Sequence, residues 1–309
     1  MLSFLLITLC ALFFTGIVNR TRSILSGRKG PGILQPIKNV ILLLRKGSIF
    51  SNSSSFIFQI APIAALASTL VAILLVPFGK YPSVISFKGD FILFIYLLAL
   101  GRFAIILNAL DTASSFEGMG ASREALYGML IEPAFLVLLG AFAVMTGHTT
   151  FFDISQAFQS GGMHGAILGV LAAFILFNIM LVETSRLPVD DPRTHLELTM
   201  IHEVMVLDNS GFDFALITLN SFLKFALFSA LIAFCITPPD LSIWIHLAVF
   251  FGVELLCAIA VGFFESFRAR NRMAKNPSYL ISISAIGLLT FIAAIVLSQY
   301  GDILSNVAQ

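Results

Sequence analysis

Charged side chains are scarce in this sequence, and their scarcity decides its class. Only 11% of the 309 residues are charged and 58% are hydrophobic, whereas an ordinary soluble domain carries roughly 25% charged residues. So few charges cannot cover a surface that faces water, which excludes a soluble globular protein. The net charge is +1 and the basic residues are spread along the chain, so a nucleic-acid-binding patch is excluded as well.

Metal-binding and nucleotide-binding patterns are also lacking. Cys10, Cys235 and Cys257 each lie alone in an apolar run, without the Cys-x-x-Cys spacing of iron–sulfur or zinc sites. His195 and His202 have no partner cysteine, and no glycine-rich nucleotide loop occurs. We interpret the cysteines as small buried hydrophobic residues. We expect the chain to bind no metal or redox cofactor and to have no catalytic centre of its own.

What the sequence does contain is long apolar segments. A hydrocarbon core of about 30 Å is crossed by about 20 apolar residues in an α-helix. Eight segments meet this requirement: 1–18, 56–79, 91–110, 124–146, 164–185, 215–237, 241–264 and 278–299. The first has no basic residues before it and no small-residue cleavage site, so we interpret it as a retained span. The predicted fold is an all-α integral membrane protein of about eight transmembrane helices, with residues 1–309 forming a single polytopic membrane domain.

The lysines and arginines predict the orientation of these spans. With loop 19–55 placed in the cytoplasm, 14 of the 18 basic residues fall in cytoplasmic loops, Arg123 among them, and only Lys80 and Lys88 fall in outer loops. Cytoplasmic enrichment of lysine and arginine is the general rule for membrane proteins. We therefore expect a multi-pass protein of the plasma (inner) membrane with both termini on the outer side. His148, His164 and His246 fall near the outer ends of spans, where we expect interfacial positions.

Two predicted cytoplasmic loops are too long to be simple connections. In loop 19–55, apolar and basic residues segregate to two sides of residues 37–46, which indicates a short amphipathic helix on the membrane surface. Loop 186–213 is dense in prolines, acidic residues and histidines, as is typical of a docking surface. No internal repeat is evident, which argues against a transporter built from inverted halves.

Ionisable residues in the spans are the candidates for function. Such residues cost several kcal/mol at membrane depth and are retained mainly where they pair or conduct ions. Four lie well inside spans and three lie at cytoplasmic ends; together they form the candidate ion-translocation path of Arg102, Glu124, Glu132, Glu183, Lys224, Glu254 and Glu265.

The spacing of these residues suggests two tracks. Glu124 and Glu132 are eight residues apart, which leaves them within roughly 80° of each other on a helix, and Glu254 and Glu265 are nearly eclipsed after three turns. Each pair would form successive steps of a hydrated path, with Arg102 and Lys224 as natural partners of the carboxylates. Pro133 withdraws an amide donor beside Glu132 and favours a kink or a water there. Static ion pairs that fix helix packing are the alternative interpretation.

Three motifs, in this order along the chain, resemble those of a known family. Residues 28–35 resemble its Arg-x-Gly-Pro-Gly-x-x-Gln turn after the first helix. The other two motifs are Arg102 with Leu-Asp-Thr at 110–112, Gly-Ala-Ser-Arg-Glu-Ala at 120–125 and Glu132-Pro133, and then Glu183-x-x-Arg186-x-Pro188-x-Asp190 with Glu197-Leu198 and Ser210-Gly211. The chain resembles the proximal membrane subunit of respiratory complex I (subunit 1). It resembles more closely the counterpart in membrane-bound group 4 nickel–iron hydrogenases, the formate hydrogenlyase subunit 4 type.

This resemblance implies a division of labour. The cytoplasmic loops 19–55 and 186–213 would hold a nickel–iron-hydrogenase-like large subunit and an iron–sulfur small subunit, whose metal centres would carry the electrons. The chain would relay protonation changes to antiporter-like membrane subunits. The residues it assigns to the docking or quinone-like loops are Arg28, Gly30, Pro31, Gly32, Gln35, Arg186, Pro188, Asp190 and Glu197.

Departures from the complex I pattern leave two alternative functions open. Arg193 and His195 stand where the resemblance leads us to expect acidic residues, and the segment 199–210 is about three residues longer. These changes argue against quinone binding and favour a hydrogenase or hydrogenase-related complex. The alternatives are the true complex I (NADH-quinone oxidoreductase) subunit that forms the quinone chamber, and a free-standing ion transporter.

Overall fold

The structure is a computed structural model that describes the chain except residues 52, 161, 192–198, 238–240 and 308–309, and only the backbone of the helical residues next to 161 and after 298. It is all-α. Its helices are α1 (Leu2–Leu25), α2 (Gln35–Leu44), α3 (Phe56–Leu74), α4 (Asp90–Asp111), α5 (Ser115–Thr146), α6 (Phe151–Ser160), α7 (Gly162–Glu183), α8 (His202–Met205), α9 (Gly211–Ile236), α10 (Ile243–Phe267), a 3₁₀ turn (Met273–Lys275) and α11 (Asn276–Val307).

Eight helices of the described chain are long and apolar enough to cross a membrane: α1, α3, α4, α5, α7, α9, α10 and α11. The predicted number of spans is therefore confirmed. The spans alternate, so that one end of the bundle, here called the loop end, carries residues 26–55, 112–114, 184–210 and 268–275. The opposite end, here called the far end, carries residues 75–89, 147–150 and 237–242. Which end faces the cytoplasm stays a prediction.

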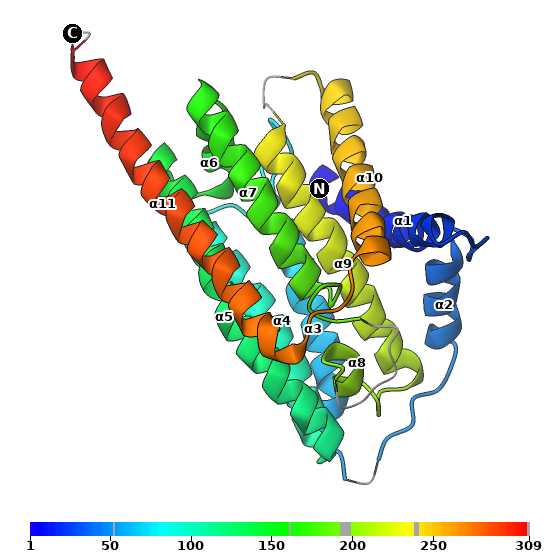
Figure 1. Ribbon diagram of the computed structural model, residues 1–309. Helices are drawn as coiled ribbons and strands as arrows, with labels where there is room; N and C mark the ends of the chain where they lie inside the picture. Colours follow the sequence, from blue (N-terminus) through cyan, green and yellow to red (C-terminus); the bar gives the residue numbers. More distant parts are fainter. Residues whose placement is uncertain (52, 161, 192–198, 238–240, 308–309) are drawn as a thin grey trace.

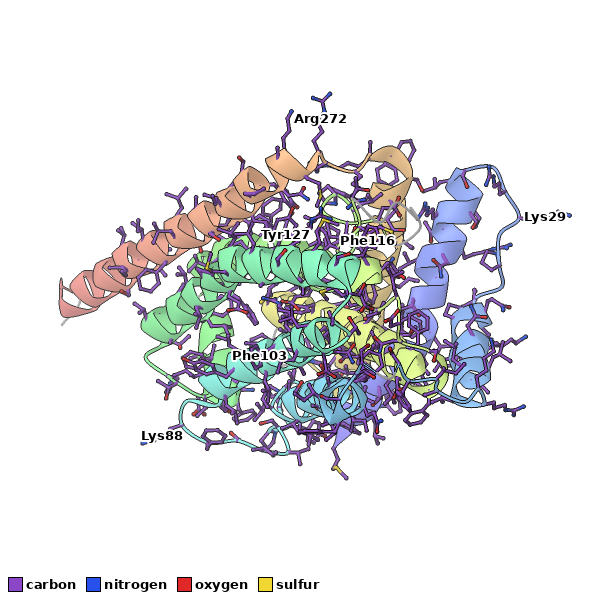
Figure 2. All side chains as sticks on the ribbon, turned by 90° about the horizontal axis from the view of Figure 1, so that it is seen from below. Lys29, Lys88, Phe103, Phe116, Tyr127 and Arg272 are labelled. Carbon is purple, nitrogen blue, oxygen red and sulfur yellow. The ribbon has the colours of Figure 1, made fainter. Side chains whose placement is uncertain are left out.

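Helix α9 is the central element of the bundle. It packs against α1, α2, α3, α7 and α10, and it has the largest buried share of the eight spans. The long, inclined α11 packs along α5, and α1 crosses α9 and α10 obliquely (Figure 1). Seen from below, Lys29 and Arg272 extend from the edges of the bundle into the surroundings (Figure 2).

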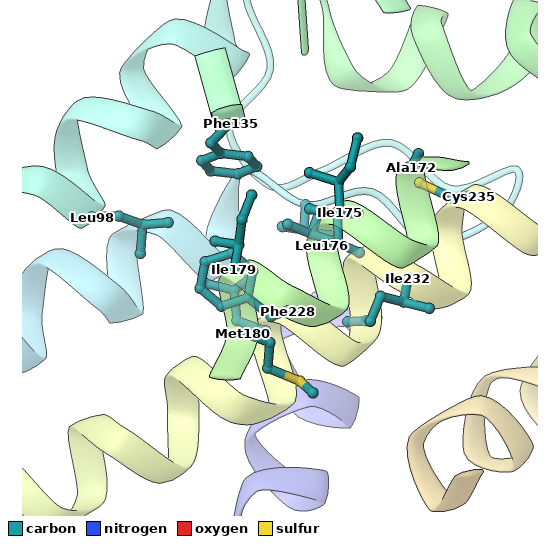
Figure 3. Close-up of a cluster of buried hydrophobic side chains, with 14 of the residues drawn as sticks. Leu98, Phe135, Ala172, Ile175, Leu176, Ile179, Met180, Phe228, Ile232 and Cys235 are labelled. Carbon is teal, nitrogen blue, oxygen red and sulfur yellow. The ribbon is translucent and has the colours of Figure 1, made fainter. Parts of the chain in front are cut away.

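One buried apolar layer of the core is important for the site. Leu98 of α4, Phe135 of α5, Ile179 of α7 and Phe228 of α9 gather in the cluster of Figure 3, and the rings of Phe135 and Phe228 lie 5.8 Å apart. We call these four side chains the apolar layer. Burial of such large side chains fixes how the four helices sit against one another.

Helix boundaries differ from the prediction in α5. This span begins at Ser115 and not at 124, so Arg123, which was predicted to lie in a loop, lies inside the helix. The polar residues 115–123 hide the helix from a hydropathy criterion, but they continue the same turns because only 112–114 connect α4 to α5. Helix α5 also continues through Pro133 as one element. The ten-residue α6 was not predicted at all.

The predicted amphipathic helix is present as α2, and the turn before it packs back on α1. A Cβ atom at Gly16 of α1 would overlap the backbone carbonyl of Ile33, so the absence of a side chain lets the turn approach. Only Pro36 and Val40 of α2 are buried, and its contacts are with α1 and α9. A position on the membrane surface stays a prediction for this helix.

Candidate functional site

Arg102 of α4 is surrounded by carboxylates from two other helices. Its side chain is 8% exposed; Nη1 lies 2.7 Å from Glu132 Oε1, and Nε lies 3.8 Å from Glu124 Oε1, both on α5. Its Nη2 contacts Glu183, the last residue of α7. A guanidinium group at membrane depth is stable in such a setting because its charge is compensated and its donors are engaged.

Glu183 joins this group to a second cation. Lys224 of α9 donates a hydrogen bond from Nζ to Glu183 Oε2 at 3.0 Å, while the other oxygen of Glu183 contacts Arg102. Arg102, Glu124, Glu132, Glu183 and Lys224 therefore form one connected set, which we call the charged cluster. It contains three carboxylates and two cations, so one bound proton makes the fully paired cluster neutral.

Local sequence explains how α5 receives Arg102. Gly128 lies midway between Glu124 and Glu132, four residues from each, so the three positions share one face of the helix. A Cβ atom at Gly128 would overlap Nη1 of Arg102 and lie 3.0 Å from its Cδ. The guanidinium group thus occupies space that any other residue at 128 would fill, which places it between the two carboxylates.

The apolar layer closes the charged cluster on the side of the far end. Each of its members precedes or follows a cluster residue by one helical turn: Leu98 and Arg102, Phe135 and Glu132, Ile179 and Glu183, Phe228 and Lys224. The four side chains are buried. Water or ions at the cluster therefore have no direct way across the membrane along these helices.

Openings are found toward the loop end and at the side. A cavity of about 20 Å³, enough for about one water molecule, is lined by Arg102, Glu183 and Lys224 together with Asn220 and His202. On the outer face of α4 and α5, a groove of about 410 Å³ reaches Arg102 and Glu132 between apolar side chains. The Glu132 side chain is 39% exposed there. The cluster thus extends from the interior to the flank of the bundle.

Glu265 belongs to a separate group at the loop end. Its two oxygens accept hydrogen bonds from Arg186 Nη1 at 2.7 Å and from Arg22 Nη1 at 3.2 Å. A cavity of about 170 Å³ lies beside it and is lined by Arg186, Glu265 and His202. We call this the loop cavity. It shares His202, Ser185 and Ser221 with the smaller cavity at the charged cluster, so the two spaces adjoin.

The segment 186–191 is anchored by Asp190. Its carboxylate lies 3.1 Å from Arg270 Nη2 and accepts hydrogen bonds from the backbone amides of His202, at 3.0 Å, and Ile201, at 3.3 Å. Burial raises the pKa of Asp190, although the amides and Arg270 act in the opposite direction. This anchor holds the start of the loop against α8.

Glu254 stands apart from both groups. It lies on α10 with no exposed surface, accepts a hydrogen bond of 2.6 Å from Ser229 Oγ, and has no ion-pair partner among the described residues. Arg102 and Lys224, the cations proposed from the sequence as partners of the carboxylates, accompany Glu124, Glu132 and Glu183 and not Glu254. Nor do Glu254 and Glu265 share a partner, although both are buried on α10.

The remaining predicted loop residues lie at the loop end. Arg28, Gly30, Pro31 and Gly32 form the turn after α1, and Gln35 opens α2 and donates to Asn39 at 3.0 Å. Glu197, with Arg193 and His195, lies outside the described residues. Sequence reasoning missed Gly128, Asn220 and Ser221 as members of the site. The signal was the helical spacing, because Asn220 precedes Lys224 by one turn and Gly128 separates two glutamates by one turn each.

Comparison with known proteins decides the family. The sequence profile of the family described as NADH dehydrogenase matches residues 1–308. The chain belongs to this family. The resemblance inferred from the three motifs is thereby confirmed, and the protein is a multi-pass membrane protein.

Two relatives in Escherichia coli (strain K12) support the hydrogenase side of the family. The chain is 30% identical to hydrogenase-4 component C over 270 residues, which cover 87% of this chain and 84% of the relative. It is 32% identical to formate hydrogenlyase subunit 4 over 184 residues, which cover 60% of each chain. A membrane subunit of the NADH-quinone oxidoreductase of Rubrobacter xylanophilus is 30% identical over 210 residues, or 66% of this chain and 61% of the relative.

A solved structure has the same fold. A chain from the membrane-bound sulfane sulfur reductase, an archaeal respiratory membrane complex, superposes with a TM-score of 0.79 at 21% identity, over 94% of this chain and 97% of that one. The NADH dehydrogenase family member described here is thus a membrane subunit of the kind found in complex I-like hydrogenase and oxidoreductase complexes.

Proposed function

We propose that this chain anchors the soluble redox arm of a complex I-like hydrogenase, or hydrogenase-related complex, and relays protonation changes to neighbouring membrane subunits. The observation that carries the proposal is the charged cluster. It adjoins the loop cavity at one side and reaches the flank of the bundle at Glu132, while the apolar layer closes the direct route to the far end.

The loop end supplies the docking surface in this proposal. Residues 26–55, 184–210 and 268–275 lie there, and they carry most of the basic residues, so this end would face the cytoplasm. A nickel–iron-hydrogenase-like large subunit and an iron–sulfur small subunit would bind it. Their metal centres would carry the electrons, and this chain would have no redox step of its own.

Electrostatic coupling is the proposed mechanism. A displacement of the docked arm would move the segment held by Asp190 and Arg270, and with it Arg186 at the loop cavity. The fields at Glu183 and Glu124 would change, since charges act strongly on one another in a medium of low dielectric constant. The cluster would then take up or release the one proton that its excess carboxylate allows, and Glu132 would pass the change sideways.

Glu132 indicates where the relay continues. A partly exposed carboxylate within a span is costly against lipid, so the groove around it suits a neighbouring membrane subunit, antiporter-like in this proposal. The test is Glu132→Gln in the whole complex reconstituted into liposomes. We expect unchanged assembly and electron transfer, and fewer protons or sodium ions moved per electron pair. Met129→Gln changes the same groove without a charge and should leave the ion yield unaltered. A full ion yield from Glu132→Gln would overturn the proposal.

The loop cavity supports a second candidate, a quinone site in a complex I type of enzyme. Arg186, His202 and Glu265 give it a polar wall, and Phe214 and Phe222 give it an apolar one. Its volume of about 170 Å³ is small, since small-molecule pockets usually measure roughly 300–1,000 Å³. Photolabelling of the complex with an azidoquinone separates the two: label on residues 184–222 favours quinone, and hydrogenase subunits that co-purify without such label favour the first proposal.

A further inference from the structure

A second polar path lies along the seam where α1, α9 and α10 meet. These three helices pack against one another. Three polar atoms buried there have no hydrogen-bond partner in the described part of the chain: Ser3 Oγ, His246 Nδ1 and Glu254 Oε1. The residues are 3%, 9% and 0% exposed. Buried polar atoms in proteins are nearly always satisfied, by water where no protein group is available.

A cavity occupies the seam between these atoms. It has a volume of about 30 Å³, enough for about two water molecules, and its polar lining residues include Ser3, Ser155, Thr237 and His246. On α9 the cavity reaches Ala230, next to Ser229, and on α10 it reaches Phe250, one turn before Glu254. It therefore ends about 6 Å along the helix axis from Glu254, at 1.5 Å per residue.

His246 separates this cavity from a more open one. The second cavity, of about 80 Å³, shares His246, Phe78 and Gly79 with the first and continues to Lys80 and Tyr81 at the far end. The imidazole ring packs edge-on against Phe78, with ring centroids 4.9 Å apart. Gly79 has a positive φ of 54°, and a Cβ there would lie 3.1 Å from the ring. A glycine at this turn is what admits the histidine.

His246, Phe250 and Glu254 follow one another at four-residue intervals, so they share one face of α10. Imidazole can accept a proton on one nitrogen and release the other proton, which suits transfer between two water-filled spaces. Phe250 packs against Phe78, with ring centroids 5.4 Å apart, and closes the cavity toward Glu254. The titratable side chains next to Glu254 are Cys10 of α1 and Cys257 of α10, and Lys80 lines the outer cavity.

We infer that α1, α9 and α10 form a half-channel that opens at the far end, with His246 at its mouth and Glu254 as its inner proton-binding group. A proton from the far side binds one imidazole nitrogen of His246, the other nitrogen releases one to cavity water, and Glu254 exchanges it when Phe250 swings aside. The transferred species as a proton rests on the proposed coupling function; the water-filled path does not.

The path differs from the charged cluster in both position and direction. The cluster is closed toward the far end by the apolar layer, while Glu254 is approached from that end and has no link to a cluster residue in the described chain. The two routes would thus give the protein access to opposite sides of the membrane, one from the loop end and one from the far end.

Cysteine accessibility tests the half-channel without reference to coupling. In the whole complex with Cys10, Cys235 and Cys257 replaced by alanine, single cysteines are introduced as Ser3→Cys and Ala233→Cys in the cavity wall. Ala226→Cys, buried on α9 outside the cavity, is the control. A small charged methanethiosulfonate reagent is applied to right-side-out and to inverted vesicles.

We expect Ser3→Cys and Ala233→Cys to react at least about tenfold faster than Ala226→Cys, because a thiol must reach water as thiolate to react. The reaction should occur from the far-end side alone. Equal and slow reaction of all three variants, or reaction from the loop-end side, would overturn the half-channel. If labelling is as expected while Glu132→Gln keeps a full ion yield, the proposed function fails and the half-channel stands.

The proton role is tested separately in liposomes. His246→Phe should fill the mouth and lower the ion yield per electron pair with unchanged electron transfer, whereas His246→Gln keeps a polar side chain of similar length and should lower it less. Equal yields from wild type and His246→Phe would refute proton passage through His246.

Discussion

Gly128 of α5 lies directly beside the guanidinium group of Arg102, so closely that a methyl group at position 128 would overlap Nη1. The contact explains how one arginine reaches two carboxylates eight residues apart on the same helix. It also means that the geometry of the charged cluster depends on a residue that bears no charge.

Substitution of Gly128 by alanine should therefore damage the site. The added methyl group would displace Arg102 from Glu132, and overpacking of this kind costs about 1–3 kcal/mol. We expect a lower thermal midpoint for the complex and a lower ion yield. The matched control is Gly118→Ala on the same helix, where a Cβ meets no atom within 4 Å. It should stabilise the helix by about 0.5–1 kcal/mol, and a Gly128→Ala variant as stable as Gly118→Ala would contradict the assigned geometry.

The sequence alone was sufficient for the architecture and for one part of the site. Eight apolar segments predicted eight spans, and the eight-residue spacing of Glu124 and Glu132 predicted that they lie on one side of α5. Both inferences use contacts within a helix, which the chain periodicity fixes. The start of α5 at Ser115 was missed because its first turns are polar, and amphipathic α6 was missed because it is short.

Contacts between helices were beyond the reach of the sequence. Glu183 joins Arg102 of α4 to Lys224 of α9 only because α7 and α9 pack side by side. Nothing in the periodicity indicates that Glu254 would lack a cation while Glu265 has two. Such pairings are set by tertiary packing, and a charge pattern along one helix carries no information about them.

The Glu183–Lys224 pair should show strong coupling. Lys224→Met leaves three carboxylates with one cation, and the loss of one partner of a buried pair costs about 3–5 kcal/mol. Addition of Glu183→Gln returns the cluster to the formal charge it has in the wild type, so the double variant should recover much of the stability. Thermal unfolding of the four proteins of this cycle in detergent measures the coupling. Additive effects of the two substitutions would show that the pair is not formed.

Two buried glutamates of α10 should respond differently to the same substitution. Glu265→Gln leaves Arg22 and Arg186 without a negative partner, which we expect to cost about 3 kcal/mol, the low end for a buried pair because Arg22 is partly exposed to solvent. Glu254→Gln keeps an oxygen for the Ser229 hydrogen bond and removes no ion pair. Its effect should stay within about 1 kcal/mol. Thermal midpoints measured side by side decide this, and a larger loss for Glu254→Gln would mean that Glu254 has a cationic partner.

The apolar layer makes the sharpest prediction, because it is what separates the charged cluster from the far end. Phe228 lies one turn from Lys224 and touches Phe135 across the layer. Phe228→Ser would remove the ring and add a hydroxyl group that attracts water, which joins the cluster to the far side. We expect liposomes that contain this complex to lose an imposed pH gradient faster than wild type, even without electron transfer.

Phe228→Leu is the matched control for this effect. Leucine is smaller than phenylalanine and costs stability, since a cavity remains, yet it keeps the layer apolar and dry. The pH gradient should therefore persist with Phe228→Leu at a similar loss of thermal stability. If both variants hold the gradient as wild type does, the layer is not the barrier, and the proposed sideways path through Glu132 loses the reason for its direction.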